Sequence, residues 1–300
     1  MAAMLVTGGS GMVAQHVAEA AIAEGHAVRL SDYCWPDERL WVQGAERVTF
    51  DIRDRVACGA HSQGVAAIIH CAAVVGPARA RVDPLLTLEV NVNGTANLLE
   101  AAYATGARLI NVSTATLYGN RPDLQPLHET DAADPLSVYD GTKLMAETYC
   151  AAHRRTYGGD AASFRTGFVY GRGSQIGEYF LPKALSGRPV IEAAGRDHPC
   201  DFTYVVDLAE ALLLAATAPK LPNSVYNVTG GVLRTRGELA EAVRALEPSA
   251  QVDLAEGIDP NRHLRGPSVL DRARQDFAWQ PRFTLEAGLT DWKKRLEAAP

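Results

Sequence analysis

Three side chains in the middle of the sequence have the chemistry to oxidise an alcohol. Tyr139 and Lys143 stand four positions apart, a spacing that places both on one face of a helix. A phenol with a pKa near about 10 is a weak base at neutral pH, and a neighbouring ammonium group stabilises the phenolate and lowers that pKa. We therefore predict that Tyr139 takes the proton of a substrate hydroxyl while a hydride leaves the carbon that carries this hydroxyl. Lys143 lowers the Tyr139 pKa in this interpretation.

Further hydroxyls follow a predicted strand at residues 109–113. Thr114 comes at its carboxyl end, which is the edge where open α/β sheets bind ligands. We predict that Thr114 hydrogen-bonds the reacting oxygen and that Thr116 also contacts substrate.

A glycine-rich turn lies where the first predicted strand gives way to the first helix. Glycines there let the backbone approach a pyrophosphate, whose charge is held by amide groups at the helix N-terminus. The small Ala14 allows the helix to pack closely on the strand. The cofactor-binding residues predicted here are Gly8, Ser10, Gly11, Met12 and Val13.

Acidic residues end the next two predicted strands. Asp32 is placed to accept hydrogen bonds from a ribose diol, and its charge repels a 2′-phosphate, which favours NAD over NADP. Asp51 and Ile52 are expected beside the adenine ring, with Asp51 on its amino group. Lys143 is expected to hold the nicotinamide ribose as well.

These residues need a parallel sheet to bring them together. Short apolar runs at residues 4–7, 27–30, 47–50, 67–71 and 109–113 alternate with helical patterns such as 13–23 and 92–103. Strand–helix–strand repeats imply right-handed crossovers and a sheet buried on both faces. The expected fold class is α/β, a Rossmann-like doubly wound parallel sheet.

The second half of the chain has a different texture. Glycines and prolines between residues 171 and 199 leave room only for short elements. We expect residues 1–167 to form the NAD-binding domain, with elements near 201–229 returning to it. Residues 168–200 and 230–300 then form a smaller, interleaved substrate lobe.

Composition excludes several other classes. A net charge of −6 without a basic block argues against nucleic-acid binding. The five cysteines are scattered, which argues against a disulfide framework and a zinc site, and no metal is expected. Without a signal-like start or a long apolar run, we expect a cytoplasmic protein that does not enter a membrane.

An ordered set of motifs along nearly the whole chain resembles the NAD-dependent epimerase/dehydratase family, the extended short-chain dehydrogenase/reductases. The set comprises Thr7-Gly8-x-x-Gly11, His70-Cys71-Ala72-Ala73, Asn91-Val92-Asn93-Gly94-Thr95, Ser113-Thr114, Tyr139 with Lys143, and residues 165–171, 201–205 and 226–228.

The resemblance implies roles for individual residues. Tyr139 is the acid/base, Asn91 supports the geometry of the active site and is counted with the cofactor site, and Ala72 and Ala73 line the nicotinamide side. His70 is expected to pack near the cofactor. A homodimer is implied through the helices that carry Asn91 and Tyr139.

The residues after Thr114 bear on the reaction. Family dehydratases place an Asp-Glu pair there, whereas this chain has Ala115-Thr116, so dehydration is not expected. Two interpretations stay open: a sugar-nucleotide 4-epimerase of the UDP-hexose type, which we place first, and an NAD-dependent dehydrogenase of a free sugar or sugar acid. A protein that binds NAD without turnover is a third.

The substrate end departs from the family pattern. Phe168 stands where nucleotide-sugar enzymes usually carry an asparagine that contacts the diphosphate, and Cys200 stands where an arginine is common. Arg196, Arg262 and Arg265 are the expected replacements, although arginines suit a free carboxylate equally. The carbohydrate substrate itself stays open.

Overall fold

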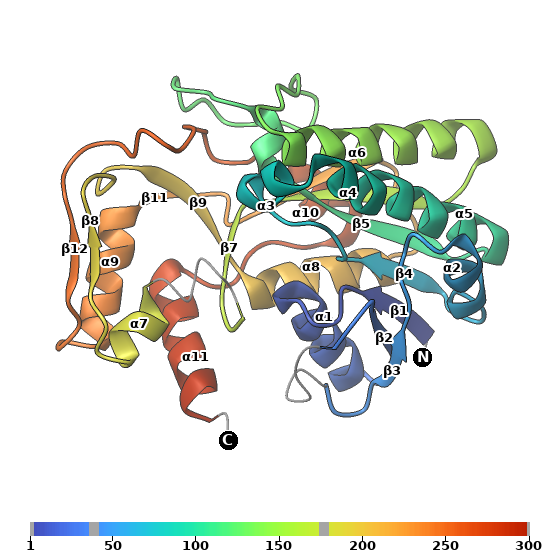
Figure 1. Cartoon of the computed structure of the whole chain (residues 1–300), viewed down its shortest axis with the longest axis horizontal. Coiled ribbons are helices and arrows are strands. Elements are labelled where there is room, and N and C mark those ends of the chain that lie inside the picture. Colours follow the sequence, from blue (N-terminus) through green and yellow to red (C-terminus); the bar gives the residue numbers. More distant parts are fainter. Residues whose placement is uncertain (1–2, 36–41, 174–179, 299–300) are drawn as a thin grey trace.

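The computed structural model describes residues 3–35, 42–173 and 180–298. Its centre is a seven-stranded sheet in the order β10-β6-β5-β4-β1-β2-β3 (Figure 1). All the strand pairs in this sheet are parallel. The strands are β1 (Ala3–Thr7), β2 (Ala27–Asp32), β3 (Glu46–Thr49), β4 (Ala67–His70), β5 (Arg108–Thr114), β6 (Ala161–Thr166) and β10 (Val225–Val228). The predicted doubly wound α/β fold is confirmed.

Helices cover both faces because the buried strands carry apolar side chains on both of their faces. Met4 and Val6 of β1 enter the core beneath one face, with α1 (Met12–Ala23) and α8 (Val205–Thr217). Leu5 enters the opposite core, with α2 (Arg55–His61) and α5 (Thr95–Thr105). The long α6 (Val138–Tyr157) lies beside α5 (Figure 1).

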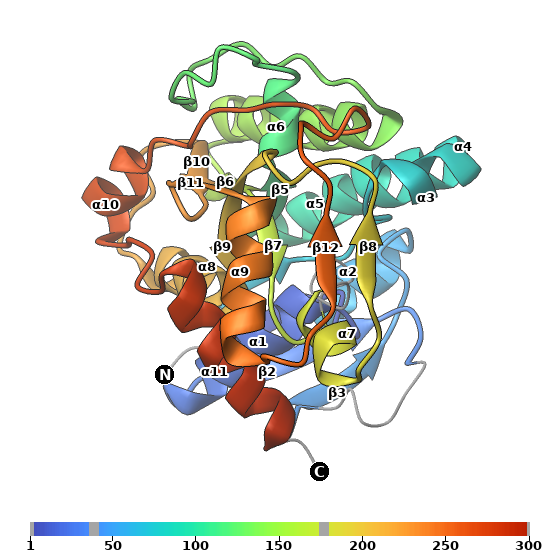
Figure 2. The same ribbon diagram turned by 90° about the vertical axis from the view of Figure 1, so that its left-hand side faces the viewer.

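A smaller lobe stands beside the sheet (Figure 2). It holds a three-stranded sheet of β7 (Phe168–Tyr170), β9 (Pro199–Tyr204) and β11 (Leu233–Thr235), and a pair formed by β8 (Val190–Glu192) and β12 (Val252–Leu254). Its helices are α7 (Leu181–Leu185), α9 (Arg236–Leu246) and α11 (Leu285–Glu297). Leu181, Leu239 and Trp292 belong to its separate apolar core.

The boundary between the lobes is interleaved, but it differs from the predicted one at two places. The return to the first domain begins with α8, because β9 pairs within the smaller sheet. Within the predicted lobe segment 230–300, α10 (Asp271–Phe277) and Trp279 pack into the first core. The Trp279 indole donates to the Asp207 carbonyl of α8 at 3.1 Å. Spacing in the sequence did not reveal these long-range contacts.

The remaining short elements surround the carboxyl ends of β4 and β5. They are α3 (Pro77–Val82), α4 (Pro84–Leu88), the π-helical turn η2 (Glu89–Gly94) and the 3-10 turn η3 (Ala115–Tyr118). Strand order reverses at β1 and β4, so this edge is the switch point where such sheets bind ligands. None of the helices in the described ranges is long and apolar enough to cross a membrane.

Candidate active site

The glycine turn packs tightly against the chain that follows β4. Gly8 has φ +77°, and a Cβ atom there would lie 2.7 Å from the Ala72 nitrogen, so only glycine fits. The Gly11 amide donates to the Gly8 carbonyl at 2.8 Å, and no side chain of the described residues caps the N-terminus of α1. The first amide groups of α1, at Met12 and Val13, therefore have no capping side chain in the described part of the chain and fit an anionic group.

Asp32 is already tied to this turn. Its Oδ2 accepts from the Ser10 amide at 2.9 Å and from Ser10 Oγ at 2.6 Å, while Oδ1 accepts from the Tyr33 amide at 2.7 Å. The residue is 8% exposed, so little water screens its charge. The prediction that Asp32 binds a ribose is compatible with this position at the end of β2.

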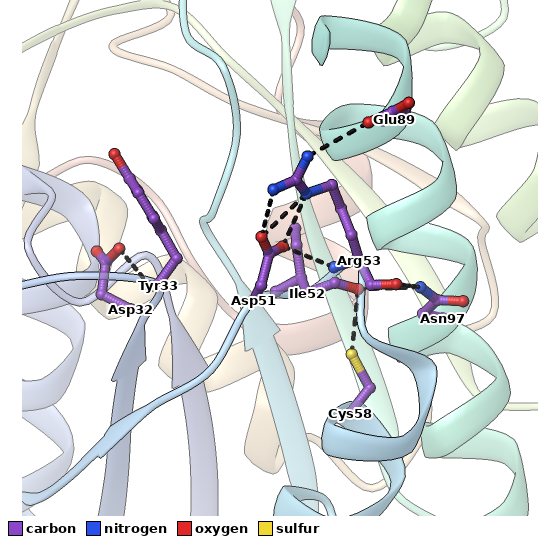
Figure 3. Close-up of polar contacts among 8 residues, drawn as sticks. All are labelled: Asp32, Tyr33, Asp51, Ile52, Arg53, Cys58, Glu89 and Asn97. Carbon is purple, nitrogen blue, oxygen red and sulfur yellow. Dashed lines mark hydrogen bonds and ion pairs between the residues drawn. The ribbon is translucent and has the colours of Figure 1, made fainter.

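Asp51 lies in a charged cluster after β3 (Figure 3). Arg53 donates to it from Nε at 2.9 Å and from Nη2 at 2.6 Å, and also reaches Glu89 at 3.3 Å. The Arg53 guanidinium is the main cause that lowers the pKa of Asp51. Ile52 is buried, and a Cβ on Gly94 would lie 2.5 Å from it. An adenine amino group at Asp51 therefore has to share the carboxylate with Arg53, which was not predicted.

Asn91 is hydrogen-bonded to two segments that border the candidate site. Its Oδ1 accepts from the Val74 amide at 2.8 Å, and its Nδ2 donates to Thr142 Oγ1 at 3.0 Å. These bonds join the chain just after Ala72 and Ala73 to the helix of Tyr139. The buried amide group is used within the protein, and its supporting role in the active site stays a prediction.

His70 is a packed, neutral side chain. It is 1% exposed, with Nδ1 2.8 Å from Thr7 Oγ1 and Nε2 3.1 Å from Thr95 Oγ1. Burial, with a smaller effect of the Lys143 charge, lowers the pKa of His70 to about 3. The ring joins β1, β4 and α5 behind the glycine turn.

Tyr139 and Lys143 lie on one face of α6, as their spacing predicted. Lys143 Nζ donates to the Val112 carbonyl of β5 at 2.8 Å, and burial lowers the pKa of Lys143 to about 8. Tyr139 is 9% exposed. Burial, and then the charge of Asp140, raise the pKa of Tyr139. In the protein alone, the lowering of the Tyr139 pKa that we expected from Lys143 is therefore not seen.

The hydroxyl groups at the end of β5 are connected to one another. Thr114 Oγ1 lies 2.9 Å from Thr116 Oγ1, and Thr116 Oγ1 donates to Asp140 Oδ1. Ser137, the N-cap of α6, donates to Asp140 Oδ2 at 2.7 Å. Asp140 was not predicted, because a carboxylate in the first turn of a helix ordinarily interacts with the helix dipole.

A cavity of about 490 Å³, a size typical of small-molecule sites, has two of the three predicted catalytic residues, Tyr139 and Thr114, on its wall, whereas Lys143 is not among its lining residues. The predicted substrate residues Thr116, Phe168 and Arg265 also line it. Other polar or ionisable residues on its wall include Arg81, Ser137, Asp140, His198, Cys200, Asp201, Arg262 and His263.

Two arginines on the cavity wall, Arg262 and Arg265, differ in how they are paired. Among the described residues, Arg265 has one hydrogen-bond partner, the Gly119 carbonyl at 3.3 Å, and no carboxylate in ion-pair contact. Arg262 pairs with Asp259 at 2.9 Å and lies over the Phe168 ring, 5.4 Å from its centroid. Burial raises the pKa of the Cys200 thiol to about 11, so this side chain adds no charge.

His198 and Asp201 are two further ionisable residues on the wall of this cavity. His198 is 2% exposed, yet its Nδ1 has no hydrogen-bond partner among the described residues. Burial lowers its pKa, with further lowering from nearby arginines, so the ring is neutral. Asp201 accepts from Thr229 Oγ1 at 2.7 Å and from the Ser268 amide at 3.1 Å, which fixes the cavity wall. His198 has no family motif around it that could have marked it in the sequence.

Arg196 does not join the other predicted substrate residues. Its guanidinium pairs with Glu241 of α9 at 2.7 Å, and it is not among the residues that line the cavity. The loop before β9 turns this side chain toward the outer surface of the lobe. The prediction for Arg196 therefore differs from the structure.

The residues around the glycine turn fit a bound dinucleotide. The close approach of Gly8 to Ala72, the uncapped start of α1 and the Asp32 carboxylate lie in chain order along one edge of the sheet. A 2′-phosphate beside Asp32 would meet a buried negative charge.

Comparison with known proteins agrees with this geometry. A family model described as the NAD dependent epimerase/dehydratase family matches residues 4–229. The chain is 27% identical to UDP-glucuronic acid decarboxylase 1 of Arabidopsis thaliana, over 98% of this chain and 70% of that protein.

Solved structures share the whole fold. UDP-glucose 4-epimerase of Thermus thermophilus, in complex with NAD, aligns with a TM-score of 0.86 at 27% identity, over 99% of this chain and 100% of that one. UDP-glucose 4-epimerase of Thermotoga maritima, with UDP-glucose, aligns with a TM-score of 0.89 at 23% identity, over 98% of both chains. This chain therefore belongs to the NAD dependent epimerase/dehydratase family and is an enzyme that uses NAD.

Proposed function

We propose that this enzyme oxidises and re-reduces a secondary hydroxyl of a sugar nucleotide, as a 4-epimerase of the UDP-hexose type. The observation that carries the proposal is one cavity whose wall holds Tyr139 and Thr114 together with two arginines, Arg262 and Arg265. A sugar beside the hydroxyl groups and a diphosphate beside the arginines match this combination of side chains. The Thermus thermophilus epimerase supports the same interpretation by its likeness over the full chain.

The roles of the residues follow from their positions. NAD, when bound, accepts a hydride from the sugar carbon. Tyr139 holds the proton of the reacting hydroxyl, and Thr114 hydrogen-bonds the same oxygen. Lys143, anchored on Val112, keeps a positive charge beneath the site. Arg265 binds the diphosphate of the substrate, and His198 supplies a neutral hydrogen-bond donor or acceptor in the same cavity.

A dehydrogenase that releases NADH from a free sugar acid is the second candidate. Phe168 and Cys200 favour it, because each removes a polar contact that a nucleotide diphosphate would use. Arg81, which lines the same cavity and has no ion pair among the described residues, would then hold the carboxylate of the sugar acid.

One experiment separates the candidates. The purified protein is incubated with NAD and, separately, with UDP-glucose, UDP-galactose, UDP-glucuronic acid, and free aldoses and sugar acids. We expect one UDP-sugar to be converted to its 4-epimer without net NADH. Sustained NADH absorbance with a free sugar acid would instead establish the dehydrogenase, and NAD binding without any reaction would favour a non-catalytic protein.

We further propose a homodimer that pairs through α5 and α6. Large apolar side chains are exposed on the outer surfaces of these helices: Tyr103 is 48%, Met145 is 54% and Tyr149 is 43% exposed. Exposed apolar patches of this kind commonly mark protein contacts. Light scattering should give twice the chain mass for the wild type and the chain mass for Met145→Glu/Tyr149→Glu.

The five free thiols support the cytoplasmic location expected above.

A further inference from the structure

A chain of hydrogen bonds leads from the cavity to a buried carboxylate. It runs from Thr114 Oγ1 to Thr116 Oγ1, 2.9 Å away, and on to Asp140 Oδ1. Asp140 is 4% exposed. Among the described residues, no cation is in ion-pair contact with it, although the charge of Arg265 acts on it at longer range.

The direction of this chain follows from a count of protons. An ionised carboxylate can only accept, so the single hydroxyl proton of Thr116 points to Asp140. The bond between the two threonines must then be donated by Thr114. Thr114 Oγ1 also accepts from the Thr116 amide at 3.2 Å, which leaves it one lone pair. Because Thr114 lines the cavity, that lone pair is available to a substrate hydroxyl.

Every proton in these hydrogen bonds therefore points from Thr114 toward Asp140, which is the direction that transfer of a substrate hydroxyl proton to the carboxylate requires. Tyr139 is less favourable as the sole acceptor in the protein alone, since burial and the neighbouring carboxylate both raise its pKa. The Asp-Glu pair of the family dehydratases is missing at Ala115 and Thr116. In this chain a carboxylate from the first turn of α6, Asp140, instead accepts a hydrogen bond from Thr116.

We propose that Asp140 is a second proton acceptor of the active site, reached from the substrate hydroxyl through Thr114 and Thr116. As the carbon gives up its hydride to NAD, the O–H bond of the substrate breaks and its proton binds Thr114 Oγ1. The original Thr114 proton passes to Thr116, and that of Thr116 passes to Asp140, which becomes a neutral acid while the carbonyl forms. Re-reduction reverses each transfer. This relay rests on the proposed oxidation of a hydroxyl, but not on which sugar carries it.

The kinetic test uses the NAD-loaded enzyme and three variants. Asp140→Asn and Thr116→Val each keep the side-chain shape and break the relay. We expect each to lower kcat about tenfold with KM changed less than about twofold, because the Tyr139 route remains. The double variant should be no slower than either single variant, since all three interrupt one chain. The dependence of kcat on the D2O fraction should be curved for the wild type and linear for the variants.

Ser137→Ala is the matched control. It removes the other hydroxyl bond to the same carboxylate, together with the α6 cap, so Tm should fall while the curved D2O dependence stays. If the losses in kcat of the two single variants multiply in the double variant, Asp140 has only a structural role. The same conclusion follows if kcat of Thr116→Val keeps the curved D2O dependence of the wild type.

Neutron diffraction from deuterium-exchanged crystals with NAD tests the relay without any substrate. The Thr114 deuteron should point to Thr116 and the Thr116 deuteron to Asp140. A deuteron on Asp140, or a Thr114 deuteron directed into the cavity, would overturn the relay alone. Oxidation of a free sugar acid instead of a nucleotide sugar would overturn only the proposed substrate, and the variants would then be measured on that acid. A wild type that oxidises no hydroxyl of the panel would overturn both.

Discussion

The cofactor half and the substrate half of the cleft differ in how far their polar groups are paired within the protein. In the cofactor half, Asp32, His70 and Asn91 each have two or more hydrogen bonds to described residues. In the substrate half, His198 has a buried nitrogen without a partner among the described residues, and Arg265 holds one carbonyl at 3.3 Å. A buried polar group left unpaired costs about 1–3 kcal/mol. A ligand that pairs these groups recovers that free energy, so the substrate half depends on its ligand more than the cofactor half does.

The largest expected effect is a loss of turnover, the property that requires both halves of the cleft. Tyr139→Phe removes one proton carrier and little volume, so turnover should fall by at least about 100-fold while NAD still binds. Single-turnover NADH absorbance and NAD titration by calorimetry measure the two properties. Near wild-type turnover in this variant would remove Tyr139 from its role.

The next effect belongs to the substrate half alone. Arg265→Met keeps the aliphatic length and removes the charge, and it should raise KM about 10- to 100-fold, because a charged hydrogen bond in a buried site is lost. NAD affinity should not change. Arg196→Met is the matched control, since Arg196 pairs with Glu241 outside the cavity, and its KM should match that of the wild type. Equal effects of the two substitutions would contradict the cavity assignment.

A pH-dependent effect belongs to the cofactor half. The ring of His70 has a folded-state pKa of about 3, whereas an unfolded histidine has a pKa near about 6.5. Above pH about 6.5, the histidine is neutral in both states, and His70 makes its full contribution to the free energy of unfolding. Below pH about 6.5, the unfolded chain binds a proton at this histidine that the folded chain does not bind. The free energy of unfolding then falls by up to about 1.4 kcal/mol per pH unit.

Urea unfolding between pH 7 and pH 5 checks this slope. His70→Asn should flatten it, and the exposed His128→Asn should leave it unchanged. The same slope in His70→Asn and the wild type would show that other groups cause the pH dependence.

The smallest effect sharpens the comparison at the NAD end. Asp32→Asn keeps one acceptor oxygen, enough for either the Ser10 or the Tyr33 amide, and removes the charge, so NAD affinity should fall about fivefold. NADP affinity should fall less or rise, because the repulsion of the 2′-phosphate is gone. Calorimetric titration with both dinucleotides measures the ratio, and an unchanged ratio would mean that Asp32 does not select the cofactor.

The same contrast explains what could be predicted from the sequence. The parallel sheet, the glycine turn and the Tyr139 helix depend on local patterns, and the structure has them where the patterns lie. The pairing of β9, the position of α10 and the outward turn of Arg196 depend on how distant segments meet. Asp140 and His198 gain their significance only from neighbours far along the chain, so no local spacing marks them. The roles of the site residues stay predictions until the variants are measured.

The anchoring of Trp279 bears on how the chain folds during synthesis. Trp279 is 1% exposed in the core of the first domain, and the Asp207 carboxylate accepts from the Arg282 and Phe283 amides at 3.1 Å each. The first core therefore lacks one wall until the ribosome has released the chain beyond residue 283. Domains that fold as soon as their own segment emerges do not have this dependence. Here the nascent NAD-binding domain stays incomplete, with part of the α8 face uncovered, until nearly the last helix has been made.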